Sequence, residues 1–258
     1  MGLKQKIQQG KKAAGTMLRV SRNPAIIYLA AQAGLDFVMF DCEGSNYTLE
    51  TMHDVTLTAK AMGLSVLARV PQLNGEDIRR TLEAGLEGIM VPMVETAEQA
   101  KQIVWYSKYA PLGERGYSAN TANTDYRKPA DLLNFLEETN QKTVVIAQIE
   151  TKTGVEHADE IAAVEGIDVL LVGPNDLSIS LGVPGDVTNP IEIEAIQKVA
   201  DACQAHGKLF SVHSGPAVCD MFADRLGFVI QKFDSDFLLE GMRAVRKYAD
   251  EKLGNKHE

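Results

Sequence analysis

Two pairs of polar residues follow apolar runs at a spacing of two. Asp41 and Glu43 end the run "FVMFDCE", and Gln148 and Glu150 end the run "TVVIAQIE". If each run is a strand, its period of two places both members of a pair on one face of the sheet. Carboxylates grouped in this way bind divalent cations or transfer protons, so both segments are candidate parts of an active site.

Glu150, in "QIET", and Asp176, in "GPNDLS", are the strongest candidates for metal ligands. They follow consecutive apolar runs, and two carboxylates completed by water and substrate oxygens suit octahedral Mg²⁺ or Mn²⁺. For either acid taken alone, a helix N-cap or an exposed rim position is an equal alternative. The Gly-Pro pair before Asp176 fixes a tight backbone turn and weakens that alternative for this residue.

Three further strand ends carry polar side chains. Arg69 ends "SVLARVP" and is suited to bind a carboxylate or a developing enolate oxygen through two hydrogen bonds. The alternative for Arg69 is a structural ion pair with Asp41 or Glu43. His213 follows the seventh apolar run as a candidate base or ligand, although a rim histidine without an identified partner is more often structural. The last run leads to two more acids, Asp234 and Asp236.

The elements that must position these residues form a regular alternation. Short apolar runs alternate with longer amphipathic segments along the whole chain, which predicts βα units with parallel strands. The predicted strands cover residues 16–20, 37–43, 65–71, 88–94, 143–150, 168–174, 208–214 and 228–234. Eight nearly continuous apolar strands favour an α/β fold of the (β/α)8 TIM barrel type, as one domain over residues 1–258.

An eight-stranded doubly wound sheet is the alternative fold. Its nucleotide-binding versions lose support because no G-x-G-x-x-G follows the first strand and no G-x-x-x-x-G-K-[ST] is present. In a barrel, catalytic groups lie at the carboxyl ends of the strands, where the polar residues above are found. The irregular segment 110–130 is long for a loop in a compact domain, and loops of that length are usually functional or mobile.

Composition narrows the possible partners and location. The net charge of −9 disfavours attraction to nucleic acid or to an anionic membrane, so a small molecule is the expected partner. Three cysteines without C-x-x-C spacing indicate neither a disulfide framework nor a thiolate metal site, which fits a reducing cytoplasm. No run of about 18 apolar residues suggests a membrane span.

The sequence resembles the HpcH/HpaI family of metal-dependent, pyruvate-specific class II aldolases. The similarity runs from about Lys4 to Lys247 and is strongest in "AGLDFVMFDCE", "LARVP", "EAGLEGIMVPMVETAEQA", "PLGERGYS", "AQIET" and "VEGIDVLLVGPNDLS". The resemblance implies a (β/α)8 barrel assembled as a homohexamer with an end helix exchanged between neighbours. It also implies cleavage of a 4-hydroxy-2-oxo acid to pyruvate and an aldehyde, with Mg²⁺, Mn²⁺ or Co²⁺ as the cofactor.

The resemblance also assigns roles to residues at matching positions. It implies that Glu150 and Asp176 bind the metal and that Gln148 and Asn175, together with Asp176, contact the substrate. Arg69 matches the arginine that binds pyruvate and stabilises the enolate. The implied mechanism has the cation bind the carboxylate and keto oxygens of the 2-oxo acid, and the cation and Arg69 share the charge that cleavage leaves.

One position departs from the family pattern. The family's strand-two motif is Asp-x-Glu-His, and its histidine takes the proton from the 4-hydroxyl, but Gly44 stands at that position. Glu83, in "TLEAG", matches the acid that raises the basicity of that histidine. Loss of a positioned base commonly lowers a rate by about a hundred- to ten-thousand-fold. Enolate chemistry that removes no hydroxyl proton, such as oxaloacetate decarboxylation, remains open.

Four explanations for Gly44 remain open at this point: a metal-bound hydroxide as base, His213 as base, a different 2-oxo acid as substrate, or removal of the histidine by engineering. A glycine is also expected where a tight turn requires positive φ. The alternatives to aldol cleavage are a 2-oxo acid decarboxylase or other carbon–carbon lyase, and a catalytically impaired barrel that only binds 2-oxo acids.

Overall fold

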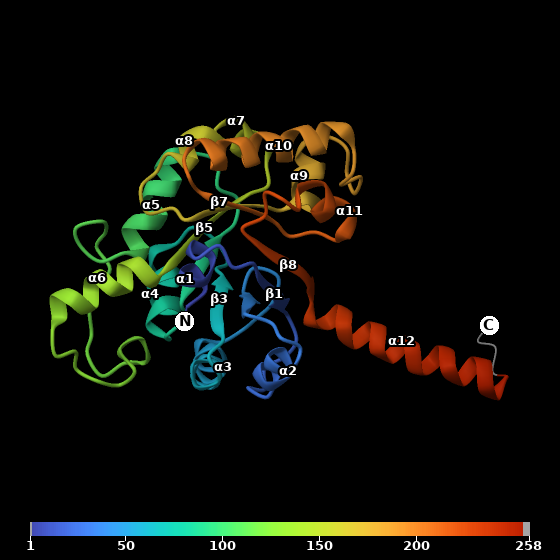
Figure 1. Cartoon of the computed structure of the whole chain (residues 1–258), viewed down its shortest axis with the longest axis horizontal. Helices are drawn as coiled ribbons and strands as arrows, with labels where there is room; N and C mark the ends of the chain where they lie inside the picture. The colour runs from blue at the N-terminus through green and yellow to red at the C-terminus, as the bar shows by residue number, and fades with distance from the viewer. Residues whose placement is uncertain (1, 255–258) are drawn as a thin grey trace.

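The computed structural model describes residues 2–254 of the chain and contains one eight-stranded parallel sheet (Figure 1). The strands, whose spatial order is β7-β6-β5-β4-β3-β2-β1-β8, are β1 (Ala13–Leu18), β2 (Phe37–Asp41), β3 (Ser65–Arg69), β4 (Gly88–Val91), β5 (Val144–Ile149), β6 (Val169–Val172), β7 (Leu209–Val212) and β8 (Phe228–Phe233). Two isolated parallel bridges, Phe210 to Leu226 and His213 to Ile230, join β7 to the β8 side. The sheet is therefore a nearly closed barrel, and the predicted (β/α)8 TIM barrel is confirmed. The ends of the predicted domain, residues 1 and 255–258, lie outside the described residues.

Helices surround the barrel on its outer side (Figure 1). They are α1 (Leu3–Gln8), α2 (Ile26–Gln32), α3 (Leu49–Met62), α4 (Gly75–Glu83), α5 (Ala97–Ser107), α6 (Leu132–Lys142), α7 (Lys152–Glu156), α8 (Ala158–Ala162), α9 (Pro174–Ser180), α10 (Pro190–Ala205), α11 (Pro216–Cys219) and α12 (Asp234–Leu253), with 3₁₀ turns η1 (Ala122–Thr124) and η2 (Asp220–Phe222). Side-chain caps begin several of them, such as Thr96 in a capping box with Gln99 before α5. The last helix, α12, projects away from the barrel.

The barrel interior is filled by apolar side chains from the strands, among them Met17, Phe37, Met39 and Ile146, all of which are buried. A Cβ at Gly15 would lie 2.5 Å from the ring of Phe37, so only glycine leaves room for that ring. This filling makes the barrel a packed core and leaves its rim as the place for chemistry.

The short helix α1 closes the amino end of the barrel. Leu3 is 0% exposed and packs with Ile7 against the interior strand residues, and the backbone N–H of Leu3 donates to Glu87 at 2.6 Å. The sequence of this segment is mostly basic and polar and did not predict a helix. Its two apolar residues, Leu3 and Ile7, lie one helical turn apart and give only a weak periodic signal.

The predicted strand ranges differ from the structure mainly at their ends. The first strand was expected at residues 16–20 but covers Ala13–Leu18, because Ala13 pairs with Phe228 of β8. Small residues such as those of "AAG" have low strand propensity, which pairing on both sides overrides here. The second and fifth strands end at Asp41 and Ile149, so Glu43 and Glu150 lie on the loops just beyond them.

The irregular segment 110–130 lies away from the carboxyl ends of the strands. Its carbonyl at Ala122 accepts a hydrogen bond of 2.8 Å from Lys60, which lies in the last turn of α3 before that helix leads into β3. The amino end of the barrel is therefore where this segment packs. Within this chain, the segment does not contribute to the rim that carries the candidate site.

None of the helices in the described part of the chain combines the length and the hydropathy that a membrane span requires.

Glu192 is a buried acid outside the rim. It lies in the first turn of α10, is 0% exposed, and neither carboxylate oxygen has a hydrogen-bond partner among the described residues. Burial, followed by the negative charge of Asp186, raises the pKa of Glu192 to about 7. Folding therefore disfavours the charged form of this side chain.

A substitution at Glu192 should change how stability depends on pH. Because the folded-state pKa is raised, its contribution is fully present below about pH 4.5 and is lost as the pH rises through about 7. We expect Glu192→Gln to increase the free energy of unfolding at about pH 8.5 by about 2 kcal/mol and to change it much less at about pH 4.5. Urea denaturation at both pH values measures this difference. The matched control is Glu194→Gln, since the Glu194 side chain is 73% exposed; an equal gain there would contradict the prediction.

Candidate active site

Asp41 and Arg69 form the centre of the polar rim. Asp41, the last residue of β2, is 0% exposed, and its Oδ1 accepts hydrogen bonds from Arg69 Nε at 2.8 Å and from the Gly44 N–H at 3.0 Å. Burial alone would raise the pKa of Asp41, but Arg69, Arg19 and the Gly44 N–H together hold it below its ordinary value. Asp41 is therefore a charged group that fixes the arginine side chains around it.

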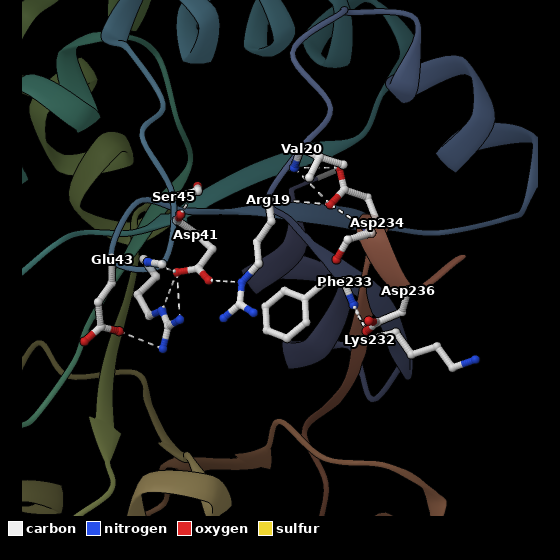
Figure 2. Close-up of polar contacts among 12 residues, drawn as sticks. Arg19, Val20, Asp41, Glu43, Ser45, Lys232, Phe233, Asp234 and Asp236 are labelled. Carbon is white, nitrogen blue, oxygen red and sulfur yellow. Dashed lines mark hydrogen bonds and ion pairs between the residues drawn. The ribbon is translucent and has the colours of Figure 1, made fainter. Parts of the chain in front are cut away.

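Arg69 also pairs with Glu43, through Nη1 at 2.8 Å (Figure 2). Both structural ion pairs weighed for Arg69 are therefore present, and Asp41 and Glu43 do lie on the same side of the barrel. Only 10% of the Arg69 side chain is exposed, so two acids hold a nearly buried guanidinium in one orientation at the rim. A cation fixed in this way is prepared to bind an anion without further ordering.

Glu150 and Gln148 form a second polar group at the end of β5. The Glu150 Oε1 accepts the N–H of Met93 at 2.9 Å, and its Oε2 accepts the side-chain amide of Gln148 at 2.5 Å. Met93 has φ of 56°, an unusual value for a residue with a side chain, and this conformation turns its N–H toward the carboxylate. The side chains of Gln148 and Glu150 thus converge as the period of two predicts.

Gly173 gives this pair its space. A Cβ at Gly173 would lie 2.5 Å from Glu150 Oε2 and 2.7 Å from Gln148 Nε2, closer than a side chain tolerates. The Gln148 Oε1 atom is buried without a hydrogen-bond partner among the described residues. An unpaired buried acceptor beside a carboxylate marks a place that a cation or a ligand donor can fill.

Asp176 and Asn175 lie in the first turn of α9, just beyond β6, and both are exposed. Burial is the main reason that the pKa of Glu150 rises to about 7, and the negative charges of Glu43 and Asp176 add to it. Burial likewise raises the pKa of Glu43, and Asp176 contributes there too. The three acids are therefore close enough to repel one another, and a divalent cation would relieve that repulsion.

These observations fit a divalent metal held by Glu150 and Asp176. The donors are hard carboxylate oxygens, Glu150 keeps free lone pairs beyond its two hydrogen bonds, and an unpaired amide oxygen lies next to it. Within residues 2–254, no group of three or more His, Cys, Asp or Glu side chains could hold a metal. A site with only two protein ligands therefore leaves several coordination positions for water and substrate.

Gly44 differs from the expectation based on turn geometry. Its φ is not in the positive range, so the backbone does not require glycine at this position, and that explanation of Gly44 is wrong. A Cβ at this residue would lie 2.7 Å from Asp41 Oδ2 and 3.1 Å from Arg19 Nη2. Crowding by these two side chains is what favours glycine here.

Glu83 lies apart from the other candidate residues within this chain. It is the last residue of α4, which leads into β4, so it lies toward the amino end of the barrel. Its Oε1 accepts a hydrogen bond from Arg115 Nη2 at 2.8 Å. In the described chain, Glu83 therefore has no contact with Gly44 or Asp41.

His213 lies near the rim but packs against Phe233, with the two rings 5.0 Å apart and nearly perpendicular. Its Nε2 is buried without a partner among the described residues. Burial is the main cause that lowers the pKa of His213 to about 4, and Arg69 and Arg19 contribute to that decrease. The imidazole is therefore neutral at pH 7 and is a weak base.

One rim residue, Arg19, was not singled out from the sequence. Arg19, just beyond β1, donates from Nε to Asp41 Oδ2 at 2.7 Å, and its guanidinium carbon lies 3.5 Å from the ring centroid of Phe233. The available signal for Arg19 was its position directly after the first strand. Asp234 and Asp236, which the sequence did place at a strand end, bind backbone N–H groups of residues 19–21 and of Phe233.

A parallel (β/α)8 barrel with acids and arginines clustered at the carboxyl ends of its strands carries these side chains where barrel enzymes have their active sites. The model of the family HpcH/HpaI aldolase/citrate lyase matches residues 16–231, and the chain belongs to this family.

Known proteins similar to this chain include aldolases and a citrate synthase. A 5-keto-4-deoxy-D-glucarate aldolase of Shigella sonnei is 33% identical over 186 residues, covering 72% of each chain. An HpcH/HpaI aldolase structure from Desulfitobacterium hafniense has a TM-score of 0.93 at 35% identity, covering 97% of each chain. The structure of the citrate synthase SbnG has a TM-score of 0.88 at 28% identity, covering 98% of this chain and 99% of that one. These relationships support a carbon–carbon lyase.

Proposed function

We propose that this protein is a divalent-metal-dependent lyase that cleaves a small 4-hydroxy-2-oxo acid to pyruvate and an aldehyde. The observation that carries the proposal is the arrangement of Glu150 and Gln148 against Gly173, with Asp176 close enough to affect the pKa of Glu150. Mg²⁺, Mn²⁺ and Co²⁺ all suit such oxygen donors. The names of the aldolase relatives support the same reaction class.

Each residue has a role in this proposal. Glu150 and Asp176 would hold the cation, which when bound acts as a Lewis acid on the 2-oxo acid. Gln148 and Asn175 would orient the substrate. Arg69, held by Asp41 and Glu43, would bind the substrate carboxylate and stabilise the negative charge that develops on the 2-oxo oxygen as the carbon–carbon bond breaks.

Decarboxylation of a 2-oxo acid such as oxaloacetate is the second candidate. The observation that favours it is the absence of a side chain at Gly44, together with the low basicity of neutral His213. In decarboxylation, the bond between carbons 3 and 4 breaks, carbon dioxide leaves, and the electron pair moves toward the 2-oxo oxygen. The resulting enolate takes a proton from water, so no residue must remove a hydroxyl proton.

The two candidates and a binding-only barrel are separated by parallel assays. Purified protein is given Mg²⁺, Mn²⁺ or Co²⁺, and pyruvate release from 4-hydroxy-2-oxo acids is measured separately from oxaloacetate loss, with a chelator as control. We expect chelator-sensitive pyruvate release. Oxaloacetate loss alone would favour the decarboxylase, and pyruvate binding without any turnover would favour a binding barrel. Absence of pyruvate release from 4-hydroxy-2-oxo acids would contradict the proposed cleavage, and failure of all three measurements would contradict every candidate.

We further propose that the chain is a cytoplasmic homohexamer in which α12 packs on a neighbouring subunit. This helix projects from the barrel (Figure 1). Support comes from exposed apolar side chains along it, including Leu238 (50% exposed), Met242 (65%) and Val245 (71%). These residues recur every three to four positions and so form one stripe, which is typical of a helix that packs against a partner.

The assembly prediction concerns that stripe. We expect Leu238→Glu combined with Met242→Glu to reduce the oligomer to smaller species, because two charges would be buried without partners. Light scattering coupled to size-exclusion chromatography measures the mass. The matched control is Arg243→Glu, an exposed position on the same helix. A wild-type monomer, or an unchanged mass in the double variant, would contradict the role of α12.

A further inference from the structure

Arg19 is held in place from three directions. Asp234 accepts the backbone N–H groups of Arg19 and Ser21, each at 2.7 Å, and Val20 at 3.2 Å. The ring of Phe233 lies under the guanidinium, and Asp41 binds Nε (Figure 2). The backbone of Arg19, one face of its guanidinium and its Nε edge are thus fixed before any ligand binds.

A β-bulge places Phe233 under Arg19. The pairing register of β1 with β8 shifts between Gly15 and Met17, where β8 contains one additional residue. In this part of β8, Lys232 has a positive φ of 57°. Bulges of this kind change the direction of the side chains that follow them and are common beside active sites. Asp236 then accepts the N–H of Phe233 at 2.9 Å, which fixes the new direction.

The terminal nitrogens of Arg19 remain available. Of its five N–H donors, the Nε–H is bound to Asp41, and Asp41 is the only acid within ion-pair distance of Arg19 among residues 2–254. The side chain is 37% exposed, so a molecule at the rim can reach it. Arg69 and the Gly44 N–H bind the other oxygen of Asp41, so Arg19 is one of several groups that hold this carboxylate in place.

The position of Arg19 relative to the candidate metal ligands is also defined. Arg69 donates to Oδ1 of Asp41 and also pairs with Glu43. Asp176 is among the charges that raise the pKa of Glu43. Arg19, in contrast, donates to Oδ2 of Asp41. Arg19 is therefore on the far side of Asp41 from the acids that would bind the cation. A molecule that touches both arginines is short, because a single carboxylate lies between them.

From these contacts we propose that Arg19 determines specificity by binding a second carboxylate at the far end of a short 2-oxo acid. The inference rests on the proposed function, because the 2-oxo end of the molecule must first be held at the metal and Arg69. Glycine at position 44 leaves the space that the Arg19 guanidinium occupies. The substrate class is thus a 2-oxo acid with a terminal carboxylate, and not one with a neutral end.

The experiment compares oxaloacetate with 2-oxobutanoate, four-carbon 2-oxo acids that differ in a terminal carboxylate or methyl group. The Mg²⁺-loaded protein binds 3-fluoropyruvate as a reporter, and ¹⁹F NMR follows its displacement by each competitor in fresh solution. We expect oxaloacetate to bind about tenfold or more tightly than 2-oxobutanoate, since hydrogen bonds to charged groups are the strong ones. Arg19→Gln should bring this ratio close to one, and Arg19→Lys should restore part of it.

The matched control is Arg22→Gln, a charge change in the same loop, because Arg22 is exposed and donates to the carbonyl of Val20. We expect the ratio of affinities to survive this substitution. Three outcomes would overturn the assignment while leaving the proposed function intact. The wild type could bind both competitors equally, or Arg19→Gln could weaken both equally. The third outcome is that Arg22→Gln loses the preference to the same extent as Arg19→Gln. Failure of the wild type to bind the reporter would overturn the proposed function, and this inference with it.

Discussion

Glu150→Gln and Asp176→Asn should each remove the bound divalent cation and lower pyruvate release by at least about a thousandfold. Both side chains lose a carboxylate oxygen that a hard cation requires, and the carbonyl of an amide carries no charge to replace it. Metal analysis of the dialysed protein measures the first effect, and initial rates measure the second. Glutamine can still accept the Met93 N–H, so the local backbone contact is kept.

The control for both variants is Glu43→Gln. Glu43 is an acid of the same cluster, but its carboxylate is paired with Arg69. We expect this variant to retain the cation. Undiminished metal content in Glu150→Gln and Asp176→Asn would contradict the assignment, and a comparable loss in Glu43→Gln would show that cluster charge, not coordination, retains the metal.

A histidine at position 44 should increase aldol cleavage once space is made for it. The Cβ of the new side chain meets Asp41 and the Arg19 guanidinium, so Gly44→His alone forces these groups to move. We expect the combination of Gly44→His with Arg19→Ala to raise cleavage of a 4-hydroxy-2-oxo acid at least about tenfold above Arg19→Ala alone, given the usual contribution of a positioned base. Steady-state kinetics measure the gain.

The pH profile identifies the origin of any gain. An imidazole acting as base should add a decline in kcat/KM below about pH 6.5, the ordinary pKa of histidine. Gly44→Ala in the same Arg19→Ala background supplies the Cβ without the imidazole and should give no increase. If the histidine variant also gives none, the proton is removed by a group other than one at position 44.

Much of this architecture follows from patterns that are local in sequence. Apolar runs alternating with amphipathic segments predict the barrel, because strands buried on both faces and crossover helices leave few other arrangements. The rule that chemistry occurs at carboxyl ends then selects residues such as Arg69, Gln148 and Glu150, and the structure brings these to one rim. The predicted strand 143–150 extended beyond the end of β5, because Glu150 continues the alternation of side chains after the strand pairing ends at Ile149.

The remainder depends on contacts that no local pattern contains. Arg19 is one cation after one strand, and its stacking on Phe233 and its bond to buried Asp41 are what distinguish it from a surface arginine. That stacking requires an additional residue in β8, which is a matter of pairing register and not of composition. The reason for glycine at position 44 is likewise non-local, because the crowding side chain of Arg19 lies 25 residues earlier in the chain.

The helix α12 begins at Asp234, the residue whose carboxylate holds the backbone of residues 19–21. The anchor of the projecting helix and the support of the Arg19 loop are therefore one residue. Any displacement of α12 at its base acts directly on that loop and on neighbouring Phe233. If α12 is held by a neighbouring subunit, dilution below the assembly concentration releases α12. Arg19 is then held less firmly against the terminal carboxylate of the substrate, although the barrel is still folded. Recognition of the substrate then becomes a function of protein concentration, and specificity declines earlier than stability.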